Sequence, residues 1–189
     1  MAEKRKITGK AFFNVFVKTA NKLKRFFVCW VWQFQQMFLG LLLVKLTKAA
    51  EKSLETPGGG KIKWWEFERN GRFTKFVSGV SLAVFILLPD NNNGDDTVRH
   101  EHGHSVQSSY LGWLYLPVVG VYSAVFCNLW QRFTQKDRNR FDRHYWYYIT
   151  RWTERWADRL GGVDREKILA GIPRPEGAKY PNIKHDKTL

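Results

Sequence analysis

The sequence predicts an α+β protein, and three observations support this fold class. Turn and strand signals gather between residues 61 and 89. An H-E-x-x-H sequence that begins at His100 has the spacing of one helix face. A basic, apolar stretch of helical composition precedes both. With 189 residues, 44% hydrophobic and 25% charged, the chain is long and apolar enough to bury a core.

The N-terminal stretch is basic and then strongly apolar. Residues 1–25 have the pattern of a basic amphipathic helix. Phe26–Val44 contains no charged residue and is long enough to span a bilayer. The amides of Gln33, Gln35 and Gln36 are costly in lipid, so a buried helix is an equal alternative.

Three segments follow from composition. Lys45–Leu54 has the composition of a polar helical tail, and Thr56–Gly60 (TPGGG) is typical of a flexible linker. We therefore expect a helical appendage over 1–56, a main domain over 57–163 and an irregular tail over 164–189.

The stretch after the linker has strand signals. Lys63–Arg69 alternates in part, and Asn70-Gly71 favours a two-residue hairpin turn before Arg72–Val77. Val80–Leu88 is rich in Val, Ile, Leu and Phe, which indicates a third, buried strand. These signals predict a small antiparallel meander.

The charge balance favours an anionic partner. The net charge is +14, yet the chain has no recognisable nucleic-acid motif, so we expect an anionic membrane surface and no specific nucleic acid. Cys29 and Cys127 lie apart in apolar runs, which favours buried free thiols over a disulfide framework.

The H-E-x-x-H sequence predicts a metal site. On a helix, His100 and His104 lie on one face, where both rings reach one zinc ion, and Glu101 is placed to activate a zinc-bound water. Gly103 weakens the helix and indicates a position kept small for close packing. His102 lies on another face, so we do not expect it to be a ligand.

A third ligand is expected from a helix over Tyr145–Leu160 that ends at two glycines. Glu154 is the preferred ligand, with His144 as its rival, and Asp158 shares its face and is placed to orient a histidine ring. The alternative is an acidic pair in salt bridges with neighbouring arginines.

H-E-x-x-H followed by E-x-x-x-D, here Glu154 to Asp158, resembles the gluzincin-type zinc metallopeptidases. The strings HEHGHSVQS and TERWADRLGGV are similar to those of a group of small uncharacterised bacterial proteins, over roughly residues 80–163. The resemblance implies zinc ligation by His100, His104 and Glu154, a catalytic base at Glu101 and a supporting carboxylate at Asp158.

Leu111–Trp130 is a second long uncharged run. Its length suits a membrane segment, although Gly112, Pro117 and Gly120 would kink it, and a buried core segment is the alternative. Because both ends must return to one metal, we expect a re-entrant or interfacial segment. The predicted location is membrane-associated, at a bacterial inner membrane, with the cytoplasm as the alternative.

The predicted function is zinc-dependent hydrolysis of a peptide or protein substrate at or near a membrane. His144 and Tyr147 are the candidates for stabilising the tetrahedral intermediate, because they precede Glu154 by up to three helical turns. The alternative function is a non-catalytic, zinc-stabilised, membrane-associated protein.

Overall fold

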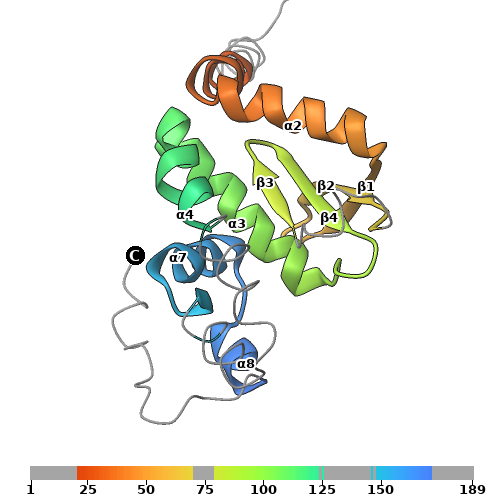
Figure 1. The fold of residues 1–189 in the computed structure, drawn as a ribbon, viewed down its shortest axis with the longest axis vertical. Helices are drawn as coiled ribbons and strands as arrows, with labels where there is room; N and C mark the ends of the chain where they lie inside the picture. The colour runs from red at the N-terminus through yellow and green to blue at the C-terminus, as the bar shows by residue number, and fades with distance from the viewer. Residues whose placement is uncertain (1–20, 70–78, 124, 126–145, 147, 172–189) are drawn as a thin grey trace, which may run out of the picture.

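A computed structural model describes residues 21–69, 79–123, 125, 146 and 148–171. A four-stranded sheet lies between helix α2 (Phe34–Thr47) and helix α3 (Asp95–Leu111). Helix α7 (Trp152–Gly161) packs against α3, and the short α8 (Arg165–Ala170) follows it at the opposite end of the molecule from α2 (Figure 1). The α+β class is therefore confirmed.

The sheet is mixed rather than a purely antiparallel meander. Its order is β1-β2-β4-β3, with β1 (Ala50–Glu55), β2 (Lys61–Phe67), β3 (Val80–Leu82) and β4 (Phe85–Pro89). The outer pairs are antiparallel, whereas β2 and β4 run parallel. The meander was thus wrong in its strand pairing, because β4 lies directly beside β2 and parallel to it. The turn expected at Asn70-Gly71 lies outside the described residues.

The segment expected to be a polar helical tail is the first strand. α2 ends at Thr47, Lys48 adopts a left-handed conformation, and β1 begins two residues later. Its helix-forming composition is overridden by pairing with β2, where Lys63 contacts Glu51 at 2.6 Å across the strands. Local propensity is a weak guide when tertiary pairing is available.

The expected linker at Thr56–Gly60 is the turn that joins β1 to β2. The N–H of Gly59 donates to the carbonyl of Thr56 at 2.9 Å, and the N–H of Thr56 donates to the carbonyl of Gly60 at 2.8 Å. Gly59 has φ of 76°, a conformation that favours glycine. The glycines therefore serve a tight hairpin and do not separate two parts of the chain.

The stretch Val80–Leu88, expected to be one strand, forms two. Leu82 pairs with Phe85 across a two-residue turn in which Ala83 has φ of 55°. The sequence carries no glycine or asparagine at this turn, so its usual signal is absent.

Strand β4 explains why both faces of the sheet are covered. Phe85 and Leu87 pack with Met37 of α2, whereas Ile86 and Leu88 pack with Val98 of α3. Successive side chains of a strand point to opposite faces, so a wholly apolar strand needs a layer on each side. α2 consequently shares a core with the sheet.

The chain after α3 is broken into short helical turns. A 3₁₀ turn (Gly112–Leu114), a π-helical turn (Leu116–Gly120) and α4 (Val121–Ser123) replace a continuous helix, as the kink-forming residues indicated. Within the described residues, no single helix has the length and hydropathy to cross a bilayer. Asn21–Trp32 and Phe34–Thr47 meet both requirements only together, across a bend of 83°.

Two boundaries near the C-terminus differ from expectation. α7 begins at Trp152 rather than Tyr145, because Arg151 is extended. Its end is as expected, at Gly161 with Gly162 left-handed. α8 occupies the start of the predicted irregular tail.

Candidate metal centre

Helices α3 and α7 cross at an unusually close contact made by two glycines. A Cβ atom on Gly103 would lie 1.8 Å from the carbonyl oxygen of Ala157, and one on Gly161 would lie 2.0 Å from that of Arg99. Any side chain at these positions would push the helices apart. The expectation that Gly103 is kept small for packing is therefore confirmed, and this contact sets the distance between the functional groups.

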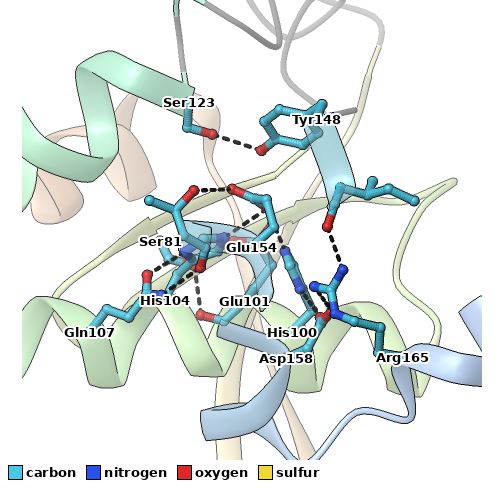
Figure 2. Close-up of polar contacts among 12 residues, drawn as sticks. Ser81, His100, Glu101, His104, Gln107, Ser123, Tyr148, Glu154, Asp158 and Arg165 are labelled. Carbon is cyan, nitrogen blue, oxygen red and sulfur yellow. Dashed lines mark hydrogen bonds and ion pairs between the residues drawn. The ribbon is translucent and has the colours of Figure 1, made fainter. Parts of the chain in front are cut away.

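Three of the predicted site residues converge between the two helices (Figure 2). Oε2 of Glu154 lies 3.2 Å from Nε2 of His100 and 3.4 Å from Nε2 of His104. One donor atom from each residue falls within 4.8 Å of the other two. Because His100 and His104 are four residues apart on α3, both rings point toward α7, as the sequence indicated.

Both histidine rings are oriented by hydrogen bonds at the opposite nitrogen. Nδ1 of His100 donates to Oδ1 of Asp158 at 2.5 Å, and Nδ1 of His104 donates to Oε1 of Gln107 at 2.8 Å. Protons held on Nδ1 leave both Nε2 atoms available to a metal when the rings are neutral. Asp158 is therefore in the orienting position that the sequence predicted for it.

The orienting groups are themselves held. Nε2 of Gln107 donates to the carbonyl of Thr153 at 2.7 Å, which ties α3 to the first turn of α7. Arg165 of α8 donates to Asp158 and to the carbonyl of Ile149. The side chains of Gln107, Thr153 and Asp158 are buried, so the supporting contacts are shielded from water.

The electrostatics of the cluster reflect an excess of buried acid. Burial favours a neutral ring, yet hydrogen bonds to Asp158 and Glu154 raise the pKa of His100 to about 10. Burial also opposes the charge on Glu154, but the nearby charge of His104 holds its pKa well below the usual range. The protein thus keeps an ionised carboxylate in its interior, and that carboxylate needs a positive partner.

A cavity of about 450 Å³ opens beside these three residues and is lined by His100, Glu101, His104 and residues 79–82. Glu101 accepts a hydrogen bond from Oγ of Ser81 at 2.5 Å, which anchors its carboxylate at the wall formed by β3. Tyr115 also lines the cavity and is nearly buried. Burial, with the charges of Glu101 and Glu154, raises the pKa of Tyr115 well above its usual value.

Two of the predicted residues cannot be placed. His144 and Tyr147 lie outside the described residues, so their proposed roles stay predictions. His102 does not belong to the cluster of candidate ligands, as expected.

Sequence reasoning missed Ser81, Gln107, Tyr115 and Arg165. The spacing of Gln107, three residues after His104, could have revealed it. The others come from separate elements and leave no local signal.

In comparisons with known proteins, no family model, curated protein or solved structure matches the chain.

Proposed function

We propose that the chain is a zinc-dependent, metallopeptidase-like hydrolase that acts at or near a membrane. The supporting observation is the donor set of His100, His104 and Glu154. Two imidazole nitrogens and a carboxylate oxygen are characteristic ligands of catalytic zinc. Bonds of about 2.0–2.1 Å in tetrahedral geometry separate donor atoms by about 3.3–3.4 Å. The two contacts to Glu154, 3.2 and 3.4 Å, agree with that separation.

The ligand environment also favours zinc over a purely structural ion-pair cluster. Orienting bonds at Nδ1 of both histidines are the usual support for a metal-bound imidazole. Three protein ligands beside a cavity leave a coordination position open, as catalytic sites require.

Bound zinc would supply a Lewis acid that polarises a carbonyl and lowers the pKa of water. Glu101, held by Ser81 at the cavity wall, takes the proton from the attacking water and returns it to the leaving amine. The phenol of Tyr115 stays protonated near neutral pH, since its pKa is raised, and donates a hydrogen bond to the developing oxyanion.

The cavity wall formed by β3 offers a binding site for an extended peptide. β3 is one of the two edge strands among the described strands, and Val80–Leu82 line the cavity. Backbone groups at an edge can pair with an added strand, which would carry a substrate carbonyl past Glu101.

Zinc per chain, measured by elemental analysis, tests the metal. We expect about one ion in the wild type and none in His104→Ala or Glu154→Ala. His102→Ala is the matched control on the same helix and should keep its zinc. A wild-type protein purified without chelator and lacking zinc would refute the proposal.

Glu101→Gln tests catalysis separately from binding. We expect it to keep its zinc and to lower cleavage of a proteome-derived peptide mixture, read by mass spectrometry, by about 10²- to 10⁴-fold. A zinc-loaded wild type that cleaves no more than this variant would instead indicate that the metal only joins α3 to α7.

A further inference from the structure

Helix α2 and its N-cap residue bury polar side chains and expose large apolar ones, unlike a helix at a water-exposed surface. Gln33 and Gln36 point inward and are buried, with Gln36 0% exposed. Phe38 and Leu46 point outward and are 67% and 69% exposed. A surface helix in water turns its apolar stripe to the core and its polar side chains outward. This helix buries apolar Met37 as well, so its outward face is apolar in addition to its inward one.

The inward amides hold this orientation. Nε2 of Gln33 donates to Oγ of Ser108 at 2.7 Å, and Nε2 of Gln36 donates to the carbonyl of Gly112 at 2.5 Å. A Cβ atom on Gly40 would lie 2.4 Å from the ring of Phe85, so the helix is seated closely on the sheet. Rotation of α2 to hide its outward side chains would break all three contacts.

The segment after α3 extends this apolar surface. Gly112 lies against the ring of Trp32, which brings the 3₁₀ turn Gly112–Leu114 beside the π-helical turn η1 (Val28–Trp32) that precedes α2. Figure 1 shows η1 and the end of α3 on the same side of the molecule. The exposed large apolar side chains of residues 28–47 and 113–121, called here the apolar face, are Trp30, Val31, Trp32, Phe34, Phe38, Leu39, Leu42, Leu46, Trp113, Leu114, Val118 and Val121.

In the sequence, cations and no acids accompany the segments that form the apolar face. Lys22, Lys24 and Arg25 are exposed just before η1, and Lys45 is exposed near the end of α2. The sequence has no Asp or Glu at positions 4–50 or 102–136. Apolar side chains flanked by lysine and arginine suit a surface of anionic lipid. The apolar groups insert into the lipid layer, and the cations are attracted to the anionic headgroups.

We propose that the apolar face inserts into the surface layer of an anionic bilayer and holds the cavity mouth there. α2 has 14 residues and is about 21 Å long, shorter than the roughly 30 Å hydrocarbon core, so it lies along the bilayer surface. Val121 belongs to the apolar face and also lines the cavity. If the site is the proposed hydrolase, its substrates are therefore peptide segments located at the bilayer surface.

Vesicle flotation of the full chain tests the insertion. We expect binding to phosphatidylcholine vesicles that contain phosphatidylglycerol, and weaker binding to phosphatidylcholine alone. The combined variant Phe34→Ser, Phe38→Ser and Leu42→Ser should lower the partition coefficient by more than about tenfold. Trp152→Ser, which removes an exposed aromatic side chain of α7, is the control and should bind as the wild type does.

These outcomes are independent of the metal site. The changed residues are exposed, so each variant should keep its fold by circular dichroism and its zinc content. Wild-type protein that does not bind anionic vesicles would overturn the proposal. A triple variant that binds vesicles as well as the wild type would also overturn it. So would a wild-type protein that forms a dimer instead of binding vesicles, if the triple variant abolishes that dimer.

The position of the cavity mouth is tested by an environment-sensitive fluorophore on single cysteines, with Cys29 and Cys127 changed to serine. Labels at Phe38→Cys and Val121→Cys should shift to shorter emission wavelength with anionic vesicles. A label at Glu166→Cys, on α8 at the far end of the molecule, should not shift. A shift at Phe38→Cys without one at Val121→Cys would overturn the placement of the cavity.

Discussion

Helices α2 and α7 both bury polar side chains, but of different kinds. α7 buries the carboxyl groups of Glu154 and Asp158 against the histidines of α3. α2 buries the amides of Gln33 and Gln36 against a hydroxyl and a backbone carbonyl. A buried amide needs only a hydrogen-bond partner, whereas a buried carboxylate also needs a compensating positive charge.

This difference distinguishes the structural contacts of the α2 amides from the charged cluster between α3 and α7. Without a metal, the charge on Glu154 is balanced by protons on histidine, and the raised pKa of His100 records that demand. A divalent cation meets the same demand and releases those protons. The amides of Gln33 and Gln36 hold no charge, so they need no compensating ion and serve to position α2.

The largest expected effect is at the crossing that builds the charged site. Gly103→Ala gains about 1 kcal/mol of helix propensity, but its Cβ would lie 1.8 Å from a backbone oxygen of α7. We expect a net loss of roughly 3 kcal/mol or more in the free energy of unfolding, measured with denaturant. Gly58→Ala, where a Cβ meets nothing within 4 Å, is the control. Equal stability of the two variants would contradict the close crossing.

The second-largest expected effect is a dependence of the stability of the metal-free protein on pH. His100 has its pKa raised from 6.5 to about 10, so its contribution is full below pH 6.5 and is lost as the pH rises through 10. Glu154 has a lowered pKa, so its contribution is present above pH 4.5 and is lost as the pH falls.

Denaturant midpoints between pH 6 and 10 in the presence of a chelator measure the His100 effect. Saturating zinc should flatten the profile over that range, because the bound ion replaces the proton. A metal-free midpoint that does not fall between pH 7 and 10 would show that the buried acids do not hold His100 protonated.

A smaller effect is expected for the residue that orients His100. Asp158→Asn keeps the shape of the side chain and removes its charge, so we expect zinc affinity to fall by about 10- to 100-fold. Competition with a chelator of known affinity measures it. Asp90→Asn, on the exposed loop after β4, is the control and should leave the affinity unchanged.

The smallest effect is expected on α2. Gln36→Met removes one hydrogen bond to Gly112, but it also removes an Oε1 atom that is buried without a partner among the described residues. The two terms oppose each other, so we expect a change of about 1 kcal/mol or less in the free energy of unfolding. A loss of several kcal/mol would place the amides of α2 among the groups that the fold depends on.

Local sequence patterns predicted which side chains share one face of a helix. The spacing of His100 and His104 fixed their shared face, and the spacing of Glu154 and Asp158 did the same on α7. The glycine pair correctly marked the end of α7. The direct pairing of β2 with β4 and the strand β1 were missed, because pairing partners rather than local composition decide how such segments form a sheet.

The sequence by itself determined which side chains can bind a metal, because ligand chemistry and helical period are local properties. It also determined the composition of the apolar segments, but not which way they face. Only the tertiary structure decided that Gln33 and Gln36 point inward, that Ser81 anchors Glu101, and that Arg165 reaches Asp158. These contacts join residues far apart in the chain, and their geometry depends on how the helices and the sheet pack.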